Sequence, residues 1–143
     1  DGVAEGVAKA FFPTGELRLE YGYKNGLTNG PFTSYYQFGH KQSEGSFFNG
    51  TIHGICTLFD ELGDISYQCS FNNGIEDGNA TAYFPKSFGG GISKSLTYKN
   101  GLKINEELSY YPTGELYERR IYDEKGYLKY EIERFNKKGE CTK

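Results

Sequence analysis

Apolar and polar residues alternate strictly along several stretches of the chain. Every second residue is apolar at Leu17, Leu19, Tyr21 and Tyr23, and again at Ile65, Tyr67, Cys69 and Phe71. A period of two places such side chains on one face of a β-strand. Three dipeptides, Thr14-Gly15, Leu62-Gly63 and Thr113-Gly114, sit where a two-residue hairpin turn would lie, with Gly supplying a positive φ. We therefore expect antiparallel hairpins and no helix.

The hairpin pattern returns at a fixed step of 24 residues, which is typical of a repeat architecture. The step links Phe11, Tyr35, Phe59 and Tyr83, and also Gly26, Gly50 and Gly74, and Gly30, Gly54 and Gly78. After Tyr83 the phase slips by three, where the segment FPKSFGGGIS carries extra residues around Gly89, Gly90 and Gly91. The dipeptides Asn25-Gly26, Asn49-Gly50, Asn73-Gly74 and Asn100-Gly101 begin the second, longer connection of each unit.

The repeat predicts one all-β domain over residues 1–143. We expect a single-layer antiparallel meander of tandem β-hairpin repeats of about 24 residues, with five to six units and ten or eleven strands. The segment Asp1–Gly6 aligns with Asn25–Gly30, so we expect the chain to open inside a repeat, as a fragment or a cut form of a longer protein. Exposed strand edges also favour an edge-mediated homo-oligomer.

Composition supports the same fold class. The chain has 20 Gly among 143 residues, 24 Phe and Tyr together, and neither Met nor Trp. Gly with aromatic residues is typical of short strands joined by tight turns. The net charge of −3 argues against nucleic acid and against charge-driven docking on anionic lipid. No apolar run is long enough for an integral membrane segment.

Units such as FFPTGELRLEYGYKNGLTNG and YYPTGELYERRIYDEKG resemble MORN repeats, most of all the bacterial variant form. They share its aromatic–aromatic–x–x–Gly start and its Tyr-Lys-Asn-Gly loop, and the resemblance covers nearly the whole chain. Tyr or Phe stands where the commoner pattern has Trp. The resemblance implies a non-catalytic sheet that scaffolds, binds partners or dimerises. It also implies, more weakly, an antitoxin-like role.

Candidate catalytic and metal-binding chemistry is sparse. His40 and His53 fall in turns, as loop polar residues do, and no Cys–His spacing suggests zinc. Carboxylates are plentiful, and a pair suited to glycoside hydrolysis stays open by sequence. However, Glu20 and Glu44 recur at one repeat position, which favours a solvated or strand-pairing role. We expect no enzyme, no cofactor and no metal.

Two cysteines face each other if Leu62-Gly63 is a two-residue turn. That register pairs Asp60 with Ile65, Leu58 with Tyr67 and Cys56 with Cys69, and directly opposed residues have Cβ atoms about 4.5–5.5 Å apart. A Cys56–Cys69 disulfide competes with two reduced thiols packed as small apolar groups, and we favour the thiols. Cys141 is left over in the tail.

The best candidate binding face is a row of aromatic residues at one repeat position, namely Phe11, Tyr35, Phe59, Tyr83 and Tyr110. The same register places Arg18, Gln42 and Ser66 opposite the first three, so we expect this face to be half exposed. The other face, with Phe12, Leu17, Leu19 and Tyr21, is expected to form the core. We predict a non-enzymatic protein-binding or scaffolding module with a protein partner. The alternatives are a purely structural aromatic row and a cell-surface carbohydrate-binding module, whose aromatic faces would stack on sugars or cage a quaternary ammonium.

Overall fold

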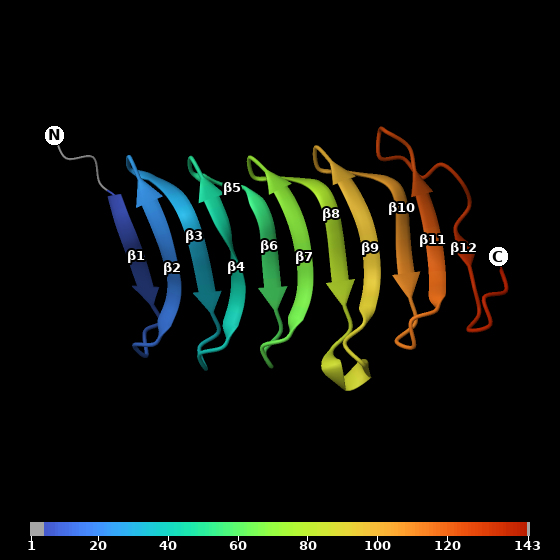
Figure 1. Ribbon diagram of the computed structural model, residues 1–143, viewed down its shortest axis with the longest axis horizontal. Coiled ribbons are helices and arrows are strands. Elements are labelled where there is room, and N and C mark those ends of the chain that lie inside the picture. Colours follow the sequence, from blue (N-terminus) through green and yellow to red (C-terminus); the bar gives the residue numbers. More distant parts are fainter. Residues whose placement is uncertain (1–4, 143) are drawn as a thin grey trace.

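The computed structural model describes residues 5–142, and these form one antiparallel sheet of sequential hairpins (Figure 1). The predicted all-β meander is confirmed. Twelve strands are present rather than ten or eleven, because two strands have only two residues. The strands are β1 (Glu5–Phe11), β2 (Leu17–Lys24), β3 (Leu27–Tyr35), β4 (Lys41–Phe48), β5 (Thr51–Ile52), β6 (Gly54–Phe59), β7 (Ile65–Asn72), β8 (Ile75–Tyr83), β9 (Ile92–Lys99), β10 (Leu102–Tyr110), β11 (Leu116–Tyr122) and β12 (Glu133–Arg134).

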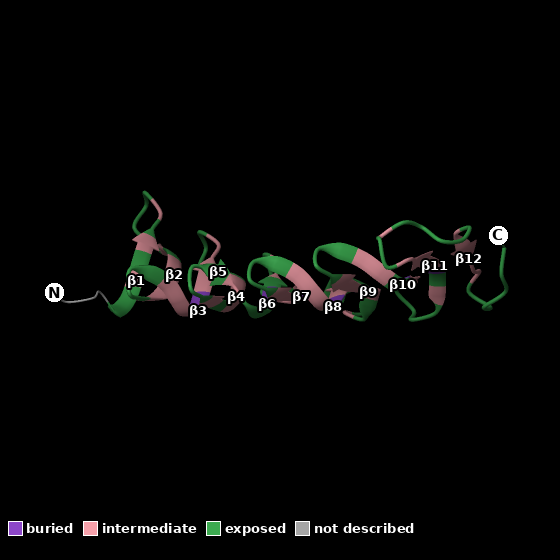
Figure 2. Cartoon of the chain, turned by 90° about the horizontal axis from the view of Figure 1, so that it is seen from above, coloured by how far each residue is buried: buried purple, intermediate pink, exposed green. Residues whose placement is uncertain are grey.

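The strands lie side by side in chain order, and only β5 leaves this path, pairing with β4. The sheet does not close, so β1 and β12 form its two edges. Seen from above, the strands make a single layer with few buried residues (Figure 2). One turn of 3-10 helix, η1 (Lys86–Phe88), lies in the inserted segment between β8 and β9, where we expected no helix. The proposed opening inside a repeat rests partly on residues 1–4, which lie outside the described residues.

The two kinds of connection have lengths opposite to those predicted. Lys24 pairs with Leu27, so Asn25-Gly26 is the two-residue turn, with φ of 54° and 76°. Positive φ at both positions is the type I′ geometry that Asn-Gly favours, because it matches the twist of the strands. The loop around Thr14-Gly15 is longer, since the Phe12 amide donates to the Glu16 carbonyl at 2.8 Å. Gly15 does take the predicted positive φ, at 102°.

The longer loop shifts the pairing of the aromatic row by one residue. Phe11 pairs with Leu17 rather than Arg18, and Tyr35 with Lys41 rather than Gln42. Phe59 pairs with Ile65, which makes the predicted Phe59–Ser66 and Asp60–Ile65 pairs wrong. The cause is a β-bulge next to the aromatic residue, which places two residues of one strand opposite one of the other. Beyond the bulge the predicted register of Cys56 with Cys69 and Leu58 with Tyr67 is confirmed.

Successive hairpins are joined at the Asn-Gly turns. The amide of Gly50 donates to the Thr28 carbonyl at 2.9 Å, and that of Gly74 to the Ile52 carbonyl at 2.8 Å. The residue that follows each Asn-Gly turn packs against the Gly of the next Asn-Gly turn. For example, Ile75 Cγ2 would lie 3.3 Å from a Cβ atom added to Gly101. Each turn therefore fixes its neighbour as well as its own hairpin.

The core is confined to one face of the sheet. Its buried apolar residues are Phe32, Cys56, Cys69, Ala80 and Leu96, from β3, β6, β7, β8 and β9. Ala80 pairs with Cys69 on one side and with Leu96 on the other, and Tyr67, Phe71 and Tyr98 pack against this group. We call this side the core face. The opposite side, called the polar face, carries the intervening residues of each strand.

Candidate functional site

The aromatic row occupies the last position of every second strand. Phe11, Tyr35, Phe59, Tyr83 and Tyr110 end β1, β3, β6, β8 and β10, directly before the hairpin loops. Members of neighbouring hairpins are two strands apart, which is roughly 9–10 Å. The row lies on the polar face, since the Tyr83 hydroxyl donates to Gln68 Oε1 at 3.2 Å and Gln68 lies between the core residues Tyr67 and Cys69. The structure thus aligns all five predicted residues in one line.

The partners of the row are more apolar than predicted, and one of them is Leu17, whose predicted place on the core face was wrong because the bulge pairs it with Phe11. Because of the bulges, Leu17, Ile65, Ile92 and Leu116 lie opposite four of the five aromatic residues, and Lys41 opposite the fifth. In the row, Phe11 is 56% exposed and the other four residues are half-buried. Of their partners, Ile65 is 41% and Ile92 46% exposed. These ten residues form what we call the tip band. The inserted segment lies beside it, so that Tyr83, Ile65 and Lys86 line one hollow of about 380 Å³.

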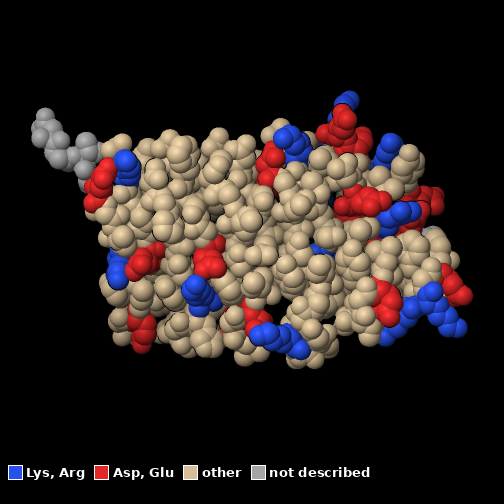
Figure 3. Space-filling model, in the orientation of Figure 1, with Lys and Arg blue, Asp and Glu red and all other residues tan. Residues whose placement is uncertain are grey.

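The rest of the polar face carries hydrogen-bonding side chains. Lys9 pairs across the hairpin with Glu20 at 2.9 Å, which is the strand-pairing role expected of that glutamate. Towards the middle, Gln68 Nε2 donates to Thr57 Oγ1 at 3.1 Å. Figure 3 shows charged side chains over β1–β4 and over β10–β12, and between them the middle of β6–β9 is largely uncharged. The tip band therefore borders an uncharged polar surface.

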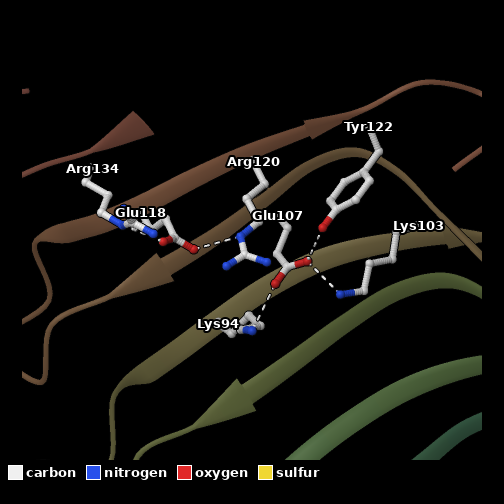
Figure 4. Close-up of polar contacts among 7 residues, drawn as sticks. All are labelled: Lys94, Lys103, Glu107, Glu118, Arg120, Tyr122 and Arg134. Atoms are coloured by element: carbon white, nitrogen blue, oxygen red, sulfur yellow. Dashed lines mark hydrogen bonds and ion pairs between the residues drawn. The ribbon is translucent and has the colours of Figure 1, made fainter. Parts of the chain in front are cut away.

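The core face ends in a network of buried charges over β9–β12 (Figure 4). Glu107 is only 2% exposed and accepts hydrogen bonds from Lys103 at 2.7 Å, Lys94 at 2.9 Å and Tyr122 at 3.1 Å. Burial by itself would raise the pKa of Glu107, but the two ammonium groups lower it to about 2. Nearby, Glu118 accepts from Arg120 at 2.7 Å and from Arg134 at 3.0 Å. Both carboxylates are held by cations, so their role is structural rather than acid–base chemistry.

Sequence reasoning missed this network, although a signal for it exists. Glu107 stands at the repeat position of Phe32, Cys56 and Ala80, at steps of 24, 24 and 27 residues. All four side chains are buried. If the repeat position of these core residues is continued past the inserted segment, it falls on Glu107 and predicts a buried carboxylate there. A buried carboxylate in turn needs cationic partners.

Comparison with protein families decides the class of these hairpins. A model described as "MORN repeat variant" matches residues 4–25 and 28–49. Residues 4–49 therefore match MORN repeats. The match covers the first two repeat lengths, and the later hairpins of the structure continue the same geometry. MORN repeats are generally protein-binding and scaffolding modules and are typically non-catalytic, and no enzyme family is matched. No curated protein matches the chain.

The hairpin formed by β6 and β7 holds the cysteine pair. Cys56 and Cys69 are direct cross-strand partners, are 8% and 2% exposed, and are both free thiols in the structure. Burial raises the pKa of both thiols, so they are protonated at neutral pH. Two reduced thiols stay the prediction, with the Cys56–Cys69 disulfide as the alternative.

The described part of the sheet holds few other groups that could carry chemistry. His40 Nδ1 lies 2.9 Å from the Glu61 carbonyl, which fixes this histidine to the neighbouring hairpin loop. Within residues 5–142, no three His, Cys, Asp or Glu side chains gather where they could hold a metal ion. The same residues include no helix with the length and apolar character needed to cross a membrane.

Proposed function

We propose that this chain is a non-enzymatic protein-binding module and that the tip band is its contact surface. The observation that supports this is the apolar band itself, which runs along one end of five hairpins and is interrupted by the charged residue Lys41. Apolar surface of this kind on a soluble sheet marks sites of protein interaction.

The chemistry of the band suits a protein partner. Tyr and Phe supply large, rigid contact area, and Tyr keeps a polar tip that tolerates water when unbound, which is why such residues dominate interface energetics. Lys9, Glu20 and Glu44 nearby would form the polar rim. A partner lying across the strands would touch each hairpin once, so its affinity would grow with the number of hairpins contacted.

A second copy of the chain is one such partner. The outer edge of β1 pairs with no strand in the described part of the chain, and open edges favour strand pairing between molecules. The ion pairs of Lys24 with Glu5 and of Lys9 with Glu20 place charges along this hairpin, which opposes edge pairing. We therefore favour the tip band over the β1 edge as the surface that binds a partner.

The test replaces three members of the row, as Tyr35→Ser, Phe59→Ser and Tyr83→Ser together. Partners are captured from native lysate on the immobilised chain and quantified by mass spectrometry. We expect one dominant protein to be lost from the variant while the melting temperature barely moves.

The matched control changes Leu27, Ile75 and Leu102 to Ser. These residues are 50%, 50% and 46% exposed and lie at the Asn-Gly end of the hairpins, so the control removes similar exposed apolar surface elsewhere. Capture that survives the tip-band variant, or that is lost equally in the control, would contradict the proposal. Loss of folding in the tip-band variant would show instead that the row is structural.

A further inference from the structure

A separate hollow of about 400 Å³ lies over β8, β9 and β10. Six of the side chains that line it are polar: Asn79, Thr81, Ser95, Thr97, Asn105 and Glu106. Its volume falls within the range of small-molecule sites, roughly 300–1,000 Å³. None of its lining residues belongs to the tip band.

The hollow exists because β10 bulges away from β9. Thr97 pairs with Ile104 and Ser95 with Leu108, so three residues of β10 lie opposite one residue of β9. Asn105 sits in this bulge with a φ of 59°, where the equivalent residues of earlier repeats are Gly30, Gly54 and Gly78. Asn tolerates this conformation better than most residues. Asn105 therefore brings a side-chain amide to the positive-φ position of the bulge, which Gly fills at the three earlier junctions.

The first hairpins provide an internal comparison. The equivalent place over β1–β3 is lined by Val7, Gly22 and Pro31 where the hollow has Asn79, Thr97 and Glu106, and it measures about 110 Å³. Glu20 and Thr33 also line this niche, so the same backbone arrangement carries a small niche of mixed lining at one junction and a larger, more polar hollow at the other. The repeat fold by itself does not require the polar lining.

The lining selects an uncharged ligand. Its one charged group, Glu106, is ion-paired with Arg119 Nη1 at 3.4 Å, so the lining offers no unpaired charge to an ionic ligand. Within residues 5–142 the side chains of Thr81, Ser95 and Asn105 make no hydrogen bond, and the contact of Thr97 Oγ1 with Asn79 Oδ1 is long, at 3.5 Å. An apolar ligand would leave these groups unpaired, which is costly.

We propose that this hollow binds a carbohydrate through neutral sugar hydroxyls. Amide, hydroxyl and carboxylate groups match both the donors and the acceptors of a polyhydroxyl ring. Leu108 adds an apolar patch at the rim for the C–H face of the ring. This binding goes beyond the proposed protein binding and uses different residues.

The test is an array of neutral and acidic glycans probed with the labelled full chain, followed by titration calorimetry with the neutral glycan bound most strongly. Asn105→Gly removes the amide and restores the residue found at the other three junctions, so this variant keeps the fold. We expect it, and Asn79→Ala, to weaken binding about tenfold each, which is roughly the effect of losing one good hydrogen bond.

Ser70→Ala is the matched control, because Ser70 holds the position of Thr97 in the preceding repeat. It should bind as the native chain does, and so should the tip-band triple variant. Failure of every neutral glycan to bind overturns the proposal. So does a preference for acidic glycans, or binding that Asn105→Gly and Asn79→Ala leave unchanged. Each of these outcomes leaves the protein-capture test unaffected.

Discussion

Replacing Glu107 with Gln should destabilise the chain in a pH-dependent way. The folded pKa of Glu107 is about 2, whereas its ordinary value is 4.5. The shift is roughly 2.5 units at about 1.36 kcal/mol each, or about 3 kcal/mol, and solvent around the half-exposed lysines reduces this to about 2–3 kcal/mol. Because the folded pKa is the lower one, this stabilisation is complete above pH 4.5 and is lost as the pH falls towards 2.

Urea unfolding followed by circular dichroism, repeated between pH 7 and pH 2, measures the difference between native chain and variant. We expect Glu107→Gln to lower the free energy of unfolding by about 2–3 kcal/mol at pH 7 and by almost nothing at pH 2. Amide hydrogen exchange should place the loss in β9–β11. Glu44→Gln breaks the exposed Lys41–Glu44 pair and should change stability by less than about 1 kcal/mol. A difference that stays constant across the whole pH range would refute the reasoning.

Two further predictions concern a close backbone approach and the thiol pair. Gly22→Ala should cost about 1–3 kcal/mol of stability, because its Cβ would lie 2.3 Å from the Asn29 carbonyl oxygen. Gly91→Ala, with nothing within 4 Å of its Cβ, should be neutral, and equal thermal stability of the two variants would contradict this. Alkylation of the air-purified chain after denaturation without reductant should label both Cys56 and Cys69. If the mass spectrum shows that neither cysteine has been alkylated, the two form a disulfide.

The fold was predictable because a repeat leaves few alternatives. The 24-residue step, the period of two and the Gly positions predict stacked hairpins, and the structure has them. The lengths of the two connections were not correctly assigned, although Asn-Gly is the strongest short-range signal for a two-residue turn. That error carried over to Phe11 and its row, whose partners moved by one residue. Bulges depend on pairing between strands, which a single strand does not encode.

The candidate site was predicted in part. The alignment of the row from Phe11 to Tyr110 follows from the repeat alone, but its aliphatic partners do not. The hollow at Asn105 depends on a bulge that opens only when β9 and β10 pair. Glu107 was overlooked because a glutamate in a strand normally faces solvent, and its burial is possible only with Lys94 and Lys103 in place.

The order of the strands has a consequence for how the chain folds. Every strand pairs with its neighbours along the path, so residues in contact are close in sequence throughout the sheet. Sheet proteins usually fold slowly because their strands pair across long stretches of chain. Here any hairpin can form first and the next can add to it, as in other linear repeat arrays. The same locality means that unfolding can begin at either end and stop part-way, leaving the middle hairpins intact.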